Sequence, residues 1–181
     1  IEDDDYNKLR LLINDLYHER IKRTKPTCDN KILCDWNGLA IDSIAKSSAI
    51  FRDDKLLNLA LQAFNFIKTS MYDGKKLYHS HCNSVNKHDG MLEDYAYLIK
   101  AGITIFEITT DEKYLEFSLE LTKTLIENFG DEEGMFFITS KMKNDIIIRN
   151  KQIVDNVMPN ANAVMIENLT KLDFITGEHR Y

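Results

Sequence analysis

The sequence predicts an all-helical fold, a partial α/α toroid built from antiparallel helix hairpins. Three observations predict it: long apolar periodicities at helical spacing, very little proline, and an internal repeat. Pro26 and Pro159 are the two prolines among 181 residues. Both fall in polar connectors, so the apolar stretches between them can form long helices.

Five helices follow from apolar residues that recur at i, i+3 and i+4. They are expected at about 5–23, 36–51, 54–71, 93–108 and 112–129. The first helix ends before a proline, because the residue preceding proline avoids the helical region. Gly-containing polar connectors follow the third and the fifth helix, so the chain is predicted to turn after each of these helices.

The repeat is visible in the residues that join the helices of a pair. Residues 52–56 (RDDKL) correspond to residues 110–114 (TDEKY) after a shift of about 58 positions, and a third copy begins at 175–181. The first helix of a pair, as at 93–108, is apolar nearly all round, whereas the second has a charged back. Helices of the first kind are therefore expected in an inner layer and the others in an outer layer.

One stretch departs from the helical pattern. Residues 135–138 and 146–148 are short β-prone runs around a polar turn at 141–145. They predict a small β-hairpin within residues 134–153, between two helix pairs.

Composition excludes several classes of function. The net charge is −6 and the pI about 5.4, so a nucleic-acid surface is not expected. No apolar run approaches the roughly 18 residues needed to span a bilayer. Cys28, Cys34 and Cys82 fit neither a zinc finger nor a redox pair, which favours reduced thiols in a cytoplasmic protein. Because the chain begins with Ile1, it is expected to be a segment of a longer protein.

Unusual polar residues gather where each inner helix is predicted to begin. The clusters are at 35–38 (DWNG), 92–95 (LEDY) and 155–162 (DNVMPNAN). Successive inner helices run parallel, so their N-termini and their positive dipole ends meet at one end of the toroid. These residues could line one ligand pocket; alternatively, they could be helix caps and core residues.

The pocket hypothesis assigns roles by chemistry. Glu93 and Asp94 are acid/base candidates, since sugar chemistry needs paired proton donors and acceptors. The candidate substrate-binding residues are Trp36, Asn37, Tyr95, Arg149, Lys151, Asp155 and Asn162. Arg149 and Lys151 could reach an anionic ligand, or instead form a salt bridge with Asp155.

The connector at 78–90 carries four residues of metal-ligating types: His79, His81, Cys82 and His88. Their spacing matches no standard zinc site. We therefore predict no metal, and the residues are expected to be ordinary loop side chains. No phosphate loop, dinucleotide fingerprint or Ser-His-Asp order is present, so no cofactor is predicted.

The clusters resemble a known family, the thioredoxin-domain-containing proteins of the spermatogenesis-associated and bacterial YyaL type. The resemblance rests on RTKP at 23–26, DNKIL at 29–33, WNGL at 36–39 and LEDYA at 92–96, and on scattered matches within 131–162. Asn30, Asn156, Val157 and Asn160 depart from the pattern, and His79 and His81 stand where more basic residues are expected.

This resemblance implies that the chain is part of the family's C-terminal (α/α)6 barrel, similar to N-acylglucosamine 2-epimerases and six-hairpin glycosidases. The family's N-terminal thioredoxin-like domain and about half of the toroid are then expected outside residues 1–181. Two hypotheses remain: a carbohydrate-active enzyme domain, or a non-catalytic binding or scaffolding domain that serves a redox domain. A small-molecule or sugar ligand is the expected partner, and exposed inner-helix surface favours self-association.

Overall fold

The structure is a computed structural model that describes residues 3–143 and 145–178. The chain divides into two units, Ile1–Asn30 and Lys31–Tyr181. The first unit contains α1 (Asp3–Ile21), close to the helix expected at 5–23. The prediction of a single domain remains a prediction, and the second unit carries the features that follow.

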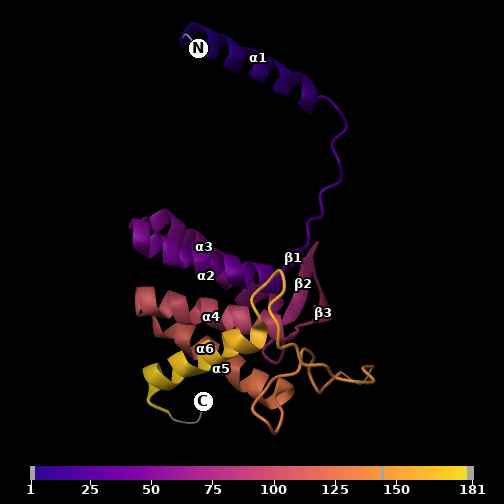
Figure 1. The fold of residues 1–181 in the computed structure, drawn as a ribbon, viewed down its shortest axis with the longest axis vertical. Helices are drawn as coiled ribbons and strands as arrows, with labels where there is room; N and C mark the ends of the chain where they lie inside the picture. The colour runs from indigo at the N-terminus through magenta and orange to yellow at the C-terminus, as the bar shows by residue number, and fades with distance from the viewer. Residues whose placement is uncertain (1–2, 144, 179–181) are drawn as a thin grey trace. The chain divides into compact units, whose positions relative to one another are not determined.

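Two layers of helices make up the second unit, as predicted (Figure 1). The inner helices α2 (Cys34–Phe51), α4 (Leu92–Thr109) and α6 (Ala161–Thr176) run in the same direction, with α4 packed between the other two. The outer helices α3 (Asp54–Phe66) and α5 (Glu112–Phe129) return the chain between them. The helix predicted at 54–71 is α3 continued by a π-helical turn, η1 (Ile67–Met71).

The repeat is reproduced in backbone geometry where each inner helix ends. Arg52, Thr110 and Gly177 all adopt the left-handed conformation, with φ of 54°, 55° and 68°. The aspartate that follows the first two caps the outer helix, accepting from Lys55 N at 2.8 Å or Lys113 N at 3.3 Å. The rest of the third copy, residues 179–181, lies outside the described residues.

Two glycines allow the inner helices and their partners to approach closely. A Cβ on Gly38 of α2 would lie 2.9 Å from the backbone carbonyl carbon of Tyr97 on α4. A Cβ on Gly102 would lie 2.2 Å from Ser118 Oγ on α5. Since these contacts leave no room for a methyl group, the hydrophobic core around α4 depends on glycine at both positions.

The β-hairpin is present, but its predicted location was wrong. The sheet has the order β1 (Ile32–Leu33), β2 (Tyr78–Cys82), β3 (Val85–Asp89), and all its pairs are antiparallel. Asn83 and Ser84, with φ of 50° and 62°, form the two-residue turn between β2 and β3. The sheet therefore lies between α3 and α4, in the connector that sequence patterns marked only by its histidines.

The described residues of 134–153 contain no strand, for a physical reason. The main-chain N–H and C=O of Phe136 bond to the side chain of Asn162, and the C=O of Thr139 bonds to Arg149. These side chains occupy groups that a β-ladder would need. Ile147 and Ile148 are consequently exposed, and Asn144, in the expected turn, lies outside the described residues.

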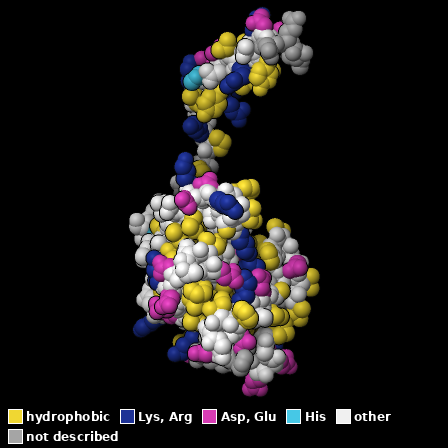
Figure 2. Space-filling model, turned by 90° about the vertical axis from the view of Figure 1, so that its left-hand side faces the viewer, with side chains coloured by type: hydrophobic (Ala, Val, Ile, Leu, Met, Phe, Trp, Pro, Cys, Tyr) yellow, Lys and Arg dark blue, Asp and Glu magenta, His cyan; other side chains and the backbone are white. Residues whose placement is uncertain are grey.

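The described residues also bear on the compositional predictions. No helix among them is long and apolar enough to cross a membrane. Cys28, Cys34 and Cys82 are all free thiols. Exposed apolar side chains at the ends of α2 and α6 include Ile50, Phe51 and Phe174, and hydrophobic side chains are visible at this end of the unit (Figure 2). Self-association through them stays a prediction.

Candidate functional site

The N-termini of α2, α4 and α6 lie on the same side of the unit, next to the sheet (Figure 1). This end, which we call the mouth, carries all three predicted polar clusters. Helix N-termini present unpaired N–H groups and positive dipole ends, which favour carboxylates there. The mouth therefore contains the predicted site residues of these clusters, and their positions differ from one residue to the next.

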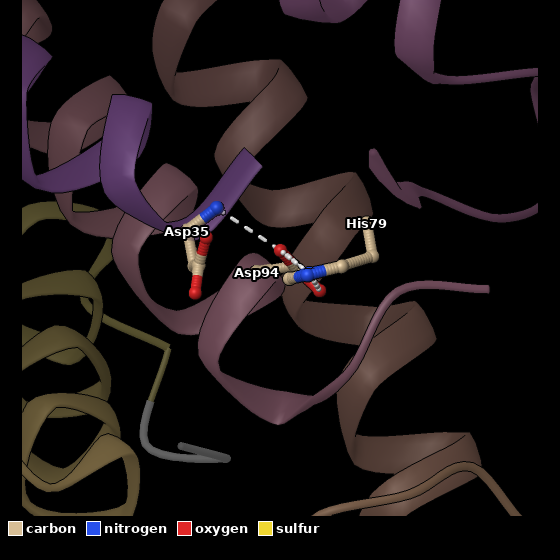
Figure 3. A group of neighbouring side chains, drawn as sticks. All are labelled: Asp35, His79 and Asp94. Atoms are coloured by element: carbon tan, nitrogen blue, oxygen red, sulfur yellow. Dashed lines mark hydrogen bonds and ion pairs between the residues drawn. The ribbon is translucent and has the colours of Figure 1, made fainter. Parts of the chain in front are cut away.

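Asp94 is the centre of the mouth's hydrogen bonding (Figure 3). It is fully buried, and its Oδ1 accepts from the backbone N of Asp35 at 3.0 Å. Its Oδ2 accepts from Met91 N at 2.8 Å, and His79 Nδ1 lies 3.0 and 3.1 Å from the two oxygens. One carboxylate thus caps two inner helices and holds a histidine from β2.

Asp35, whose backbone N donates to Asp94, is also buried. Its Oδ1 accepts from Trp36 N at 2.8 Å. Burial, and then the charge of Asp94, raise the pKa of Asp35. Burial likewise raises the pKa of Cys34, whose Sγ is 3.9 Å from the main-chain oxygen of Asp94, so this thiol is an inert core group.

Glu93 points elsewhere than Asp94. It lines a cavity of about 150 Å³ between α4 and the start of α6, together with Tyr97, Gln152, Asn156, Met158 and Ala161. Its Oε2 is buried and has no hydrogen-bond partner among the described residues. Burial, followed by the charges of Asp94 and Asp35, raises the pKa of Glu93. An unpartnered carboxyl of this kind can hold or release a proton in response to a ligand.

Tyr97 is a residue that sequence reasoning missed. Its hydroxyl donates to the main-chain oxygen of Pro159 at 2.5 Å, and burial raises its pKa to about 12. The signal available was its position one turn after Glu93 on the same helix face. Gln152 and Asn156 lie in an irregular segment, so no periodicity could have placed them in the cavity.

The three residues Asp35, His79 and Asp94 have candidate ligand atoms within 4.8 Å of one another. This spacing would suit a metal ion, but both oxygens of Asp94 already accept hydrogen bonds. The absence of a metal here stays a prediction. Of the other histidine-connector residues, His81 bonds Asn86 at 2.7 Å through Nδ1, and neither Cys82 nor His88 joins this cluster.

Side chains of the third cluster, at 155–162, form hydrogen bonds with main-chain groups. Asn160 caps α6 by accepting from Ala163 N at 3.1 Å, and Asp155 accepts from Asn160 N at 2.7 Å. Asn162 is 8% exposed and bonds the N–H and the C=O of Phe136 at 2.8 and 3.1 Å, and Gln152 O at 3.1 Å. These contacts fold the irregular segment onto α6.

Arg149 and Lys151 are also engaged away from Glu93. The Arg149 guanidinium donates to Thr139 O and Asn128 O and lies 4.1 Å from the ring centroid of Phe137. Lys151 pairs with Asp131 and, at 3.3 Å, with Glu133. A salt bridge of these two cations with Asp155 was therefore the wrong alternative, because Arg149 bonds main-chain oxygens and the acidic connector after α5 supplies the carboxylates for Lys151.

The two aromatic candidates are separated by burial. Trp36 is 62% exposed at the start of α2, whereas Tyr95 is 3% exposed. The Tyr95 hydroxyl accepts from Leu77 N at 2.9 Å, and its ring packs 5.3 Å from that of Phe129. Asn37 donates to Leu33 O at 2.8 Å within α2. Two of the predicted site residues at the mouth are therefore available to a ligand. Trp36 is exposed, and Glu93 has an oxygen without a hydrogen-bond partner among the described residues.

Comparison with known proteins finds relatives along nearly the whole chain. Human spermatogenesis-associated protein 20 is 30% identical over 189 residues, which cover 96% of this chain and 24% of that protein. An uncharacterised Caenorhabditis elegans protein is 27% identical over 174 residues, covering 92% of this chain and 24% of its own length. The chain spans about a quarter of these relatives, and no family model matches it.

Solved structures share the fold. A GH76 α-mannanase from Bacteroides thetaiotaomicron superposes with a TM-score of 0.65 at 16% identity, over 87% of this chain and 43% of that one. Cellobiose 2-epimerase from Bacillus thermoamylovorans gives 0.67 at 16% identity, over 84% and 42%. A sugar epimerase from a ruminal bacterium gives 0.63 at 18% identity, over 83% and 40%. At these identities the likeness establishes the fold alone.

Relatives and fold thus agree with the resemblance drawn from the sequence motifs. Homologues named spermatogenesis-associated protein 20 cover most of this chain, which corresponds to about a quarter of their length, and the solved structures show that it has an α/α toroid fold.

Proposed function

We propose that this segment forms one wall of a sugar-binding pocket in a carbohydrate-active toroid of the epimerase or glycosidase kind. Glu93 is its proton-exchanging carboxyl, and Trp36 is a stacking surface at the rim. The observation that carries the proposal is the position of Glu93 at the inner-helix N-termini, where the residue lines a cavity and its buried Oε2 has no hydrogen-bond partner among the described residues.

Two further features support this proposal. The exposed Trp36 at the start of α2 and the cavity-lining Glu93 at the start of α4 would provide an apolar face and a proton-transfer group, which is what a sugar ring requires. The solved structures with the same fold include enzymes named for mannan and for cellobiose. Both names describe those proteins, and they supply the substrate class to be tested here.

The test is a screen of sugars and glycans against the natural full-length protein, read by turnover and by thermal shift. Glu93→Gln should abolish turnover while a bound sugar still raises the melting temperature. Glu116, exposed on the outer helix α5, provides the matched control, and Glu116→Gln should leave turnover unchanged. Neither turnover nor binding by wild type, across the screen, would contradict the proposal.

A second candidate is a non-catalytic binding or scaffolding domain that serves the thioredoxin-like domain implied by the motifs. It is favoured by the internal hydrogen bonding of the other polar candidates, Asp94, Arg149 and Asn162. Affinity purification of the full-length protein under reducing and oxidising conditions tests it. If a sugar raises the melting temperature and no protein partner is enriched, this candidate is eliminated.

A further inference from the structure

His79 is held by a hydrogen-bond network that fixes which ring nitrogen carries hydrogen. Asp94 accepts a backbone N–H on each oxygen, from Asp35 at 3.0 Å and from Met91 at 2.8 Å. A carboxylate that accepts these two N–H groups acts as an acceptor toward His79 as well. The hydrogen between them therefore belongs to Nδ1 of His79, 3.0 and 3.1 Å from the two oxygens.

The Nε2 nitrogen is consequently the one that gains and loses a proton. All hydrogen bonds of this imidazole to the described residues run through Nδ1, and the side chain is 20% exposed. Pairing of Leu33 with Ser80 holds β2 at the start of α2, so the ring is fixed beside the mouth. An imidazole oriented by a buried carboxylate, whose second nitrogen makes no hydrogen bond to the described residues, is arranged for proton transfer.

Charged groups surround the ring from three elements. Asp35 approaches from α2, Asp94 and Glu93 from α4, and the neighbouring strand β3 carries Lys87, His88 and Asp89. The hydrogen bond to Asp94, and then the charges of Asp94, Asp35 and Glu93, raise the pKa of His79 although burial opposes the shift. These neighbours thus favour the imidazolium form of His79 more than water does.

We propose that His79 is a catalytic acid of the sugar site, and that Asp94 is its positioning residue. This inference rests on the proposed function. In the step, the Nε2–H bond breaks and an O–H bond forms on a sugar oxygen, while the bonding pair stays on Nε2. Asp94 keeps its hydrogen bond to Nδ1, and water returns the proton to Nε2 afterwards.

The first test uses nitrogen-15 NMR of the natural full-length protein labelled at histidine. Above its pKa, His79 should show a protonated Nδ1 and an unprotonated Nε2, with a pKa above the ordinary value of about 6.5. Asp94→Asn should lower that pKa. A ring protonated on Nε2 in its neutral form would overturn the inference without reference to any activity.

The second test uses His79→Asn, because the asparagine amide can replace the Nδ1 donor to Asp94 while Nε2 is removed. We expect kcat to fall about 10²- to 10⁴-fold, with sugar affinity retained and the alkaline limb of the pH profile lost. The matched control is His81→Asn on the same strand, where Nδ1 bonds Asn86 instead; its kcat should equal that of wild type.

The outcomes separate the two proposals. If Glu93→Gln abolishes turnover but His79→Asn turns over like wild type, the inference about His79 is wrong and the proposed function stands. If wild type neither binds nor converts any sugar, both are wrong. If His79→Asn loses its fold, His79→Gln tests the same step by retaining a group near the position of Nε2 that cannot donate a proton as an acid.

Discussion

Two parts of the mouth contrast in how their polar groups are used. At the starts of α2 and α4, and counting only the residues that the structure describes, Glu93 has a buried oxygen without a hydrogen-bond partner, and His79 forms its hydrogen bonds through Nδ1. At the start of α6, Asn160 and Asn162 each bond main-chain groups that would otherwise be unsatisfied. The first part therefore has side-chain groups available to a ligand, whereas the polar side chains of the second part stabilise the fold.

The contrast matters because sequence motifs mark both parts equally. Polar side chains that bond backbone groups stabilise a fold. Buried polar groups without hydrogen-bond partners lower its stability but are available for binding or catalysis. Substitutions can therefore separate the two classes by comparing effects on unfolding with effects on ligand binding.

The largest effect on stability is expected for Asp94→Ala. It leaves Asp35 N, Met91 N and His79 without their acceptor in a buried site, at a cost of about 3–5 kcal/mol. Denaturant unfolding of the natural full-length protein measures it. Asp89→Ala is the control, because Asp89 is partly exposed and pairs only with Lys76, and should cost under about 1 kcal/mol. Equal losses in the two variants would contradict the role of Asp94 as a shared cap.

Asn162→Ala should cost less, about 2–3 kcal/mol, since it removes bonds to Phe136 and Gln152. It is expected to lower the melting temperature while sugar affinity, measured by calorimetry well below that temperature, stays within about twofold of wild type. A loss of affinity larger than tenfold, with the melting temperature unchanged, would instead place Asn162 among the ligand-binding residues.

Sequence patterns predicted the helices and the convergence of their N-termini, because burial periodicity and the repeat are local signals. Capping residues were also predictable in kind, and Asn160 performs that role. The position of the hairpin was not, since residues 135–138 are as β-prone as a strand. What decides against a strand is Asn162, a residue distant in sequence that takes both main-chain groups of Phe136.

The site residues of the motif at 92–95 look equivalent in the sequence but differ in burial and in surroundings. Glu93, Asp94 and Tyr95 are consecutive, yet a helix sends them in directions about 100° apart. Glu93 faces the cavity, Asp94 is enclosed between α2 and β2, and Tyr95 packs on Phe129. Only the positions of neighbouring elements reveal which of the three a ligand could reach.

Glu93→Gln should have a smaller effect, and of the opposite sign. Because the folded-state pKa of Glu93 is raised, its stabilising effect is complete below the unfolded value of about 4.3 and is lost as pH rises through the folded pKa. Glutamine lacks this dependence, so the variant's stability relative to wild type should increase with pH above about 4.3. Melting curves from pH 4 to 8 measure it; a stability difference that does not change with pH would contradict the raised pKa.

The smallest effect is expected for Trp36→Ala, under about 0.5 kcal/mol, because the side chain is 62% exposed. Phe64→Ala is the control for removal of an aromatic ring, since Phe64 is fully buried and its loss should cost about 3–5 kcal/mol. Trp36 is the single tryptophan of the chain. In a full-length variant whose other tryptophans are replaced by phenylalanine, a sugar stacked on Trp36 should shift its emission to the blue, and the Asn162→Ala variant should show the same shift. A large loss of stability in Trp36→Ala would mean that Trp36 stabilises the fold, as Asn160 and Asn162 do at the start of α6. The proposed contrast between the two parts of the mouth would then be wrong.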